Sequence, residues 1–229
     1  MPIFRRENGK LEAVPGNYAI LDDYGKMPIE TLPIEFLTSE HYENHNGDVN
    51  NFLETAVTGI GTATEDTTNH KMYLHNPNGG GLGSALYRTK KQYIPDSEIL
   101  TASFLIDDLV VGTGGSGLHL IGLSDALPAL STGGYCFTLW SYGGTMGWWI
   151  LVYNNTSNNL TASPVDPVAG DIVSFVISKT TSKAFINNVE IYSSAIIPAG
   201  LMNAGVSVAH YAGVIDHDIS IDYMSVNKI

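Results

Sequence analysis

Hydrophobic and polar residues alternate along many short stretches of this chain. Such alternation places every second side chain on one face of an extended strand. No stretch repeats with the period of about 3.6 residues that marks a helix, and clusters of Gly, Pro and Asn separate the stretches. We therefore predict an all-β fold, an antiparallel sandwich. The expected strands cover 52–63, 71–75, 84–92, 99–111, 118–123, 135–142, 148–153, 171–178, 183–186, 189–192 and 217–226.

The pattern is clearest in the C-terminal third. Asn187-Asn188 separates two alternating stretches, and Asn tolerates the positive φ that a two-residue hairpin turn requires. In the last stretch Ile219, Ile221 and Tyr223 share one face. This order of strands resembles the C-terminal half of concanavalin-A-like and laminin-G-like jelly rolls, over about residues 50 to 229. The resemblance implies a jelly-roll fold and carries little information on function.

The N-terminal part has a different pattern. Asp22-Asp23-Tyr24-Gly25 is a turn signal, and Pro28 and Pro33 fix the backbone and remove two hydrogen-bond donors. We predict an extended attachment arm over residues 1–37, followed by a β-sandwich domain over 38–229. The residues expected to anchor the arm are Leu21, Gly25, Lys26, Met27, Pro28, Ile29, Leu32 and Pro33.

The segment from Leu21 to Pro33 resembles a linker phrase of bacteriophage tail-fibre and related virion-appendage proteins. The resemblance implies a structural virion protein: a tail fibre, a head fibre or a capsid decoration subunit. It also implies that the chain is assembled in the host cytoplasm, is exposed on the particle surface, forms a homotrimer and binds other virion proteins through its arm.

Composition excludes two classes of partner. The net charge is −12, and Lys and Arg never cluster beyond pairs. Proteins that bind nucleic acid need a basic face, and so do proteins that bind anionic membranes. No run of about 18 apolar residues is present, and the N-terminus lacks the apolar core of a secretory signal. We expect neither a nucleic-acid partner nor membrane insertion.

Residue types that carry metal or thiol chemistry give no clear site. The single cysteine, Cys136, lies in an apolar run and is expected to be a small buried residue. His41 and His45 lie four residues apart, but Glu43 is not at the position that zinc proteases require. We interpret 41–45 as a polar loop and predict no metal and no cofactor.

The last predicted strand carries three acidic residues on one face. Asp216, Asp218 and Asp222 alternate there, but Ser220 interrupts them. Glycoside hydrolases need two carboxylates on either side of the scissile bond. We interpret these residues as solvated acids of an edge strand. The predicted catalytic set is empty, and we predict that the protein is not an enzyme.

Aromatic residues around a Gly-rich turn give a candidate glycan-binding surface. Sugars bind through flat faces stacked on aromatic rings and through hydrogen bonds to amides. Adjacent Trp148 and Trp149 point to opposite faces of a strand, so at least one is a core residue, and the other contacts a glycan or a neighbouring subunit. The candidate residues are Trp140, Tyr142, Trp148, Trp149, Tyr153, Asn154 and Asn155.

Three hypotheses follow. The first is a structural virion protein anchored by its arm. The second adds binding of host-surface glycan by a lectin-like sandwich. The alternative to both is a carbohydrate-binding or glycan-cleaving enzyme module of a secreted or cell-surface protein.

Overall fold

The computed structural model describes most of the region that follows the predicted arm. The described residues are 3–7, 10–14, 41–43, 45, 53–77, 83–95, 99–110, 116–125, 134–142, 145–154, 156–212 and 217–228. The backbone alone is described for 3–14, 41–43, 116–118, 139–142, 145–146, 210–212 and 217 within these ranges. The chain divides into two compact units, Met1–Ser39 and Glu40–Ile229.

The first unit contains one antiparallel hairpin. β1 (Ile3–Glu7) pairs with β2 (Lys10–Val14). The expectation of a simple extended arm did not include this hairpin. All eight predicted anchoring residues, from Leu21 to Pro33, lie outside the described residues, so the arm and its boundary stay predictions.

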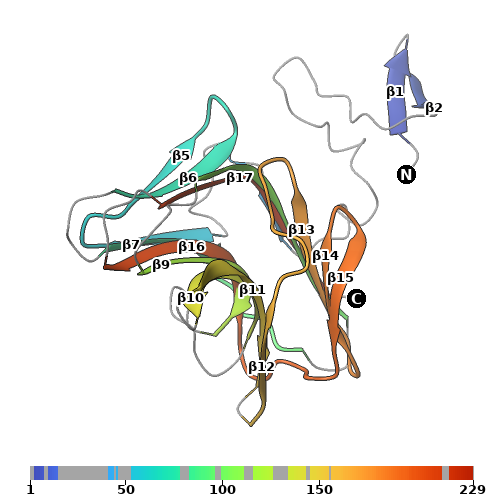
Figure 1. Cartoon of the computed structure of the whole chain (residues 1–229). Coiled ribbons are helices and arrows are strands. Elements are labelled where there is room, and N and C mark those ends of the chain that lie inside the picture. The colour runs from blue at the N-terminus through green and yellow to red at the C-terminus, as the bar shows by residue number, and fades with distance from the viewer. Residues whose placement is uncertain are drawn as a thin grey trace. The chain divides into compact units, whose positions relative to one another are not determined.

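The second unit is a sandwich of two antiparallel sheets, which confirms the predicted fold class. In Figure 1 both sheets curve in the same sense, and the seven-stranded sheet lies on the inner side of the curve. Its strands, in spatial order, are β12 (Asn158–Ala162), β11 (Thr145–Tyr153), β10 (Gly134–Tyr142), β9 (Ser116–Ser124), β16 (Asn203–Ala212), β7 (Gly83–Thr89) and β4 (Leu53–Thr58).

The second sheet has eight strands and covers the first. Its spatial order is β15 (Val189–Ser194), β14 (Ser182–Ile186), β13 (Ile172–Ile177), β8 (Leu100–Val110), β17 (His217–Lys228), β6 (Lys71–Asn76) and β5 (Thr62–Asp66). A short strand, β3 (His41–Glu43), also pairs with β17. The described part of the chain contains no helix, and therefore none long and apolar enough to cross a membrane.

The local predictions agree well with these strands. Asn187 and Asn188 have φ values of 51° and 65°, as the hairpin turn between β14 and β15 requires. The stretch 52–63 contains β4 and the beginning of β5. β12 was not predicted, because its sequence is rich in Asn and shows little alternation.

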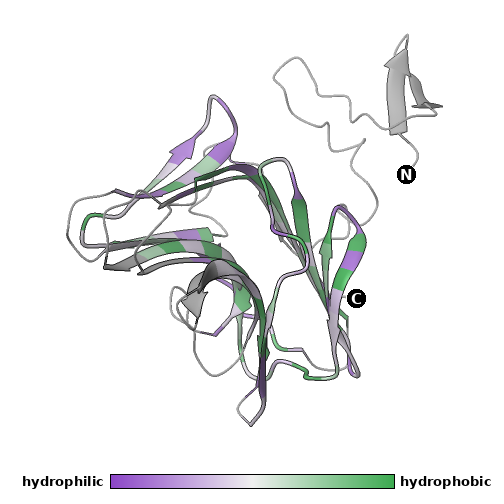
Figure 2. Ribbon diagram, in the orientation of Figure 1, coloured by the Kyte–Doolittle hydropathy of each residue, from purple (hydrophilic) through white to green (hydrophobic). Residues whose placement is uncertain are grey.

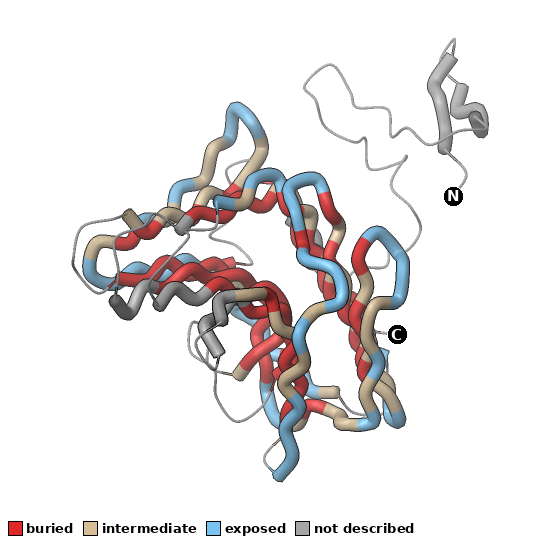
Figure 3. The backbone as a smooth tube through the Cα atoms, in the orientation of Figure 1, coloured by how far each residue is buried: buried red, intermediate tan, exposed pale blue. Residues whose placement is uncertain are grey.

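One large apolar core holds the two sheets together. At its centre the ring of Phe175, from the eight-stranded sheet, lies 5.1 Å from that of Tyr135 and 5.7 Å from that of Phe137, both on β10 of the other sheet. Phe104, on β8, packs edge-on against the same ring. Burying each such side chain stabilises the fold by roughly 1.5–3 kcal/mol. Figure 2 shows hydrophobic residues along these strands, and Figure 3 shows their burial.

The predicted polar loop at 41–45 is wrong. His41–Glu43 form β3, which pairs with Met224–Val226 of β17. His45 is fully buried, and its Nδ1 lies 3.2 Å from the hydroxyl oxygen of core residue Tyr87. The polar sequence of 41–45 did not indicate a strand, because this strand forms only by pairing with β17 near the C-terminus.

Candidate functional site

The candidate site is the concave face, the outer side of the seven-stranded sheet. Pairing registers place its residues in rows that cross the strands. One row consists of Ala56, Leu86, Ser207, Leu120, Thr138, Trp149 and Ala162. The next row consists of Glu54, Arg88, Gly205, Gly122, Cys136, Leu151 and Leu160.

The middle of the concave face is apolar and buried. Its residues form a second cluster, separate from the core between the sheets: Leu86, Leu120, Cys136, Leu151, Tyr153 and Ala209, with Leu160 at its margin. Satellite clusters of this kind usually lie under long loops. Cys136 is buried as predicted, and burial raises the pKa of its thiol to about 12. The thiol is therefore inert at neutral pH.

Two glycines lie opposite each other in the middle of the second row. A Cβ atom on Gly122, whose φ is +148°, would lie 2.5 Å from the carbonyl oxygen of Tyr135. A Cβ atom on Gly205 would lie 2.4 Å from the carbonyl oxygen of Tyr87. Neighbouring strands approach too closely for any larger residue here, and this part of the face carries no side chains.

Two hydroxyl groups flank Leu120 in the first row. Ser207 and Thr138 are fully buried, and neither side-chain oxygen has a hydrogen-bond partner among the residues the structure describes. A buried hydroxyl without a partner costs roughly 1–3 kcal/mol. A sheet built only for stability would place apolar residues of the same shape at these positions.

The charged groups of the concave face lie at one side, on β4 and β7. The Nε of Arg88 donates to Oε1 of Glu54 at 2.6 Å, and both side chains are partly exposed. Thr58 and Ser84 share a hydrogen bond of 2.8 Å at the other end of the same two strands. Glu54 is the one carboxylate that the described strand residues place on this face.

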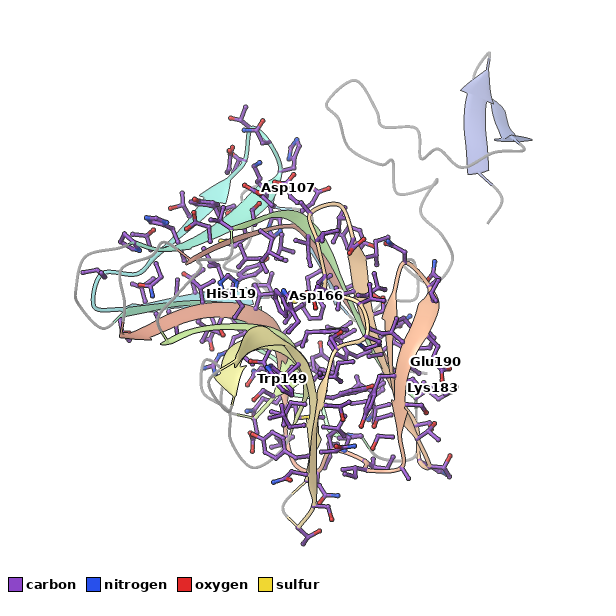
Figure 4. All side chains as sticks on the ribbon, in the orientation of Figure 1. Asp107, His119, Trp149, Asp166, Lys183 and Glu190 are labelled. Carbon is purple, nitrogen blue, oxygen red and sulfur yellow. The ribbon has the colours of Figure 1, made fainter. Side chains whose placement is uncertain are left out.

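The structure separates the predicted aromatic residues. Trp149 lies on the concave face and is partly exposed (Figure 4). Trp148 is a core residue, and its ring meets that of His119 at a centroid distance of 6.1 Å. We therefore remove Trp148 from the candidate set. Tyr153 is on the concave face but nearly buried within the apolar cluster.

The remaining predicted residues contribute less to this face. The side-chain oxygen of Asn154 accepts hydrogen bonds from the backbone of Thr156 and Ser157, and its amide donates to the carbonyl of Ile197. Asn154 therefore serves a turn. For Trp140 and Tyr142 the structure describes the backbone alone, and Asn155 lies outside the described residues.

The convex face, the outer side of the eight-stranded sheet, carries a polar network. Asp107 of β8 accepts hydrogen bonds of 2.8 Å from the ammonium group of Lys71 and from the hydroxyl of Ser220. His75 of β6 bonds through Nδ1 to the carboxylate of Asp218. Figure 4 shows Asp107 on this side of the sandwich. Every one of these polar groups has a partner.

The interpretation of Asp216, Asp218 and Asp222 as solvated edge-strand acids is wrong for Asp218 and Asp222, and Asp216 lies outside the described residues. β17 is the last strand in the sequence but lies between β6 and β8 in the sheet. Asp218 is buried against His75, and Asp222 is partly buried. Burial and the nearby charge of Asp107 raise the pKa of Asp222. For Asp107, burial acts in the same direction, but the hydrogen bonds from Lys71 and Ser220 outweigh it and lower its pKa.

The chemistry available to these faces differs. Retaining glycosidases place two carboxyl groups about 5–5.5 Å apart, and the described part of the concave face offers Glu54 alone. On the convex face, Asp107 bonds to Lys71 and Asp218 bonds to His75. No three His, Cys, Asp or Glu side chains within the described ranges come together as metal ligands.

Comparison with known proteins yields matches at the level of structure. No family model and no curated protein sequence matches the chain. The pseudo β-1,3-glucanase of Mycobacterium tuberculosis matches with a TM-score of 0.60 at 11% identity, over 84% of this chain and 99% of that one. The endo-1,3-β-glucanase of Streptomyces sioyaensis matches with a TM-score of 0.58 at 12% identity, over 83% and 96%.

A lectin shares the same fold. Peanut lectin matches with a TM-score of 0.54 at 17% identity, over 82% of this chain and 96% of the lectin. The chain therefore has a concanavalin-A-like β-sandwich fold, as the order of its C-terminal strands led us to expect.

These matches contradict the prediction that the protein is not an enzyme. Several of the structures that share the fold are glycoside hydrolases, including a β-1,3-1,4-glucanase from a mouse hindgut metagenome. The prediction rested on the absence of an acid pair on one predicted strand. Strands far apart in the sequence meet in this fold, so a pattern along one strand was an insufficient test.

Proposed function

We propose that this chain is a carbohydrate-binding β-sandwich module that binds or cleaves a glycan at its concave face. The observation that carries the proposal is the position of Trp149, a partly exposed indole on the concave face of a fold shared with glucanases and a lectin. Aromatic rings on concave surfaces stack on the flat faces of sugar rings.

The surroundings of Trp149 support a neutral glycan as the ligand. Its neighbours on the adjacent strands are Thr138 of β10 and Ala162 of β12, and neither carries a charge. The Arg88–Glu54 pair lies on the far side of the face and is internally neutralised. Acidic sugars gain most from an unpaired basic group, which the described part of this face lacks.

The experiment measures binding to neutral polysaccharides. We expect the full chain to be retarded in gels that contain β-1,3-glucan or mixed-linkage β-1,3-1,4-glucan, and Trp149→Ala to weaken binding at least tenfold. Loss of one stacked aromatic ring of this kind costs roughly 1–3 kcal/mol. The matched control is Tyr73→Ala, which removes a partly exposed aromatic residue from the convex face and should leave binding unchanged.

The same samples separate binding from cleavage. Release of new reducing ends from either glucan identifies an enzyme, and its loss in Glu54→Gln would place that carboxylate in the reaction. Retardation without release identifies a binding module. If none of a broad panel of neutral polysaccharides is retarded or cleaved, the proposed function fails.

We also propose, on the resemblance of residues 21–33 alone, that the chain is a phage virion protein that forms a homotrimer and displays this sandwich to host-surface glycans. The test targets the arm. Isotope-mixed full-length chains should give chemical crosslinks between Lys26 residues of different copies. If Lys26 forms crosslinks only to other lysines of its own chain, the arms do not meet and this proposal fails.

A further inference from the structure

One edge of the seven-stranded sheet is open. β4 is the last strand of that sheet, and β7 is its single neighbour among the strands that the structure describes. Residues 55–58 are all exposed. The unpaired side of an edge strand is a template for a strand from another chain unless a local feature blocks it.

Three of the other edge strands, β5, β15 and β12, each carry a blocking feature. β5 ends in the acidic residues 65–66. β15 contains a register shift against β14 and carries Glu190, which pairs with Lys183 at 2.7 Å (Figure 4). β12 is connected across the sandwich to β15, because the amide of Asn159 donates to the hydroxyl of Tyr192. These charges, bulges and contacts prevent further strand pairing.

β4 lacks the register shift of β15 and the cross-sandwich contact of β12, and its single charged residue, Glu54, lies near one end of the strand. Its register with β7 is regular from Leu53 to Thr58, and no proline or charged residue follows Glu54 within the strand. Thr55, Val57 and Thr58 are β-branched and favour extended structure. The edge is therefore both open and suited to strand pairing.

At this edge, side chains that point toward the core remain exposed. Val57 and Thr55 pair with Ala85 and Tyr87 of β7, which are fully buried core residues, so all four point toward the space between the sheets. Nevertheless Val57 is 53% exposed. A further strand beside β4 would cover Val57 and extend the core by one strand.

The neutral edge of β4 and its self-complementary register suit a second copy of this chain as the partner. A net charge of −12 makes most surfaces of two copies repel each other. β4 is neutral apart from Glu54, which is paired with Arg88 of its own chain. In an antiparallel pairing centred on Ala56, Thr55 lies opposite Val57 of the second copy and Glu54 lies opposite its Thr58, so no like charges meet.

We propose that β4 is a self-association edge, through which two copies pair about a two-fold axis near Ala56 and join their seven-stranded sheets into one continuous sheet. The contact is self-complementary and closes with two copies. One short strand pair gives a small interface, so the association depends on concentration.

The test is a charge exchange on the full chain, followed by sedimentation. We expect the wild-type mass to rise with concentration to twice that of the T55K/V57K variant, because lysines on the two copies then face each other. T55E/V57E should behave like the lysine variant. An equimolar mixture of the two variants should recover the larger mass, since Lys then lies opposite Glu, and this recovery also shows that both variants are folded.

Val189→Lys is the matched control, because it makes the same exchange at a more exposed position on the blocked edge strand β15. It should leave the mass unchanged. The proposal is overturned if wild type and T55K/V57K have equal mass at every concentration, or if mixing the two charged variants recovers nothing. T55K/V57K should still bind glucan. A failure of the proposed self-association can therefore be distinguished from a failure of the proposed function.

Discussion

The concave and convex faces of this sandwich share one core but differ in how they hold their most buried hydroxyl groups. On the convex face, Asp107 accepts from both Lys71 and Ser220, and Asp218 bonds to His75. On the concave face, the hydroxyls of Thr138 and Ser207 are buried without a partner in the described structure. The hydroxyl of Ser220 is thus stabilised by its contact with Asp107, whereas the buried hydroxyls of Thr138 and Ser207 are features that stability does not explain.

This difference indicates where function belongs. A polar network with every group partnered is stable in water and needs no ligand. Unpartnered buried hydroxyls and a partly exposed tryptophan lower stability, and a face that serves recognition tolerates such features. The comparison therefore favours the concave face as the functional surface independently of the fold relatives.

The largest expected effect concerns the apolar cluster of the concave face. Leu120 is fully buried there, so Leu120→Ala should lower the free energy of unfolding by about 2–5 kcal/mol through lost burial and a residual cavity. Chemical denaturation measures this value. Leu160→Ala, at the partly exposed margin of the same cluster, is the control and should cost less than half as much. A loss below about 1 kcal/mol for Leu120→Ala would mean that this face is not a packed surface.

The second prediction concerns the convex face. Asp218→Ala removes a buried carboxylate and leaves His75 without its partner, so we expect a loss of about 1–3 kcal/mol in the free energy of unfolding. Asp108→Ala is the control, because Asp108 is exposed on the neighbouring strand and bonds only to the adjacent backbone amide. Equal effects of the two substitutions would show that the network contributes nothing specific.

The third prediction tests the contrast between the faces directly. Ser220→Ala removes a partnered hydroxyl and should lower the free energy of unfolding by about 0.5–1.5 kcal/mol. Thr138→Val removes an unpartnered hydroxyl with little change in shape and should raise it by about 1 kcal/mol. Thermal and chemical denaturation of both variants gives the two signs. Destabilisation by Thr138→Val would show that its hydroxyl has a partner and would remove the contrast.

Alternation of hydrophobic and polar residues, together with turn residues, predicted the positions of most strands of this fold. The hairpin of β14 and β15 follows from alternation and from the tolerance of Asn187 and Asn188 for positive φ. The same reasoning failed for β12, whose Asn-rich sequence forms a strand because it pairs with residues 149–153 of β11. Pairing with a neighbouring strand can override the local preference of a sequence. The pairing partners of a strand cannot be identified from a single sequence.

The candidate site was less predictable for the same reason. Alternation required Trp148 and Trp149 to face opposite ways, but it did not tell which one faces the core. The row that joins Ser207, Leu120 and Thr138 exists only through the pairing of β16, β9 and β10. Likewise, Asp218 gave the pattern of an edge-strand acid because the position of β17 in the sheet is a property of the whole topology.

The smallest expected effect concerns two acids of the convex face with opposite pKa shifts. The pKa of Asp222 is raised above its ordinary value of 3.8, so the folded state holds its proton more tightly than the unfolded state. Stability therefore falls as pH rises from 3.8 through the raised pKa, and the penalty is complete above that pKa. The pKa of Asp107 is lowered, so Asp107 contributes stability above 3.8, and this contribution is lost as pH falls through its lowered pKa.

Asparagine at these two positions should thus act in opposite directions at neutral pH. We expect Asp222→Asn to raise the melting temperature at pH 7 and Asp107→Asn to lower it, each by about 1–3 °C. Both melting-temperature differences from wild type should become smaller toward pH 3. Asp222 is then largely protonated in the folded and the unfolded state, and Asp107 becomes increasingly protonated as pH falls. Melting curves between pH 3 and pH 7 measure the trend. If both substitutions shift the melting temperature in the same direction at pH 7, the opposite pKa shifts assigned to Asp107 and Asp222 are wrong.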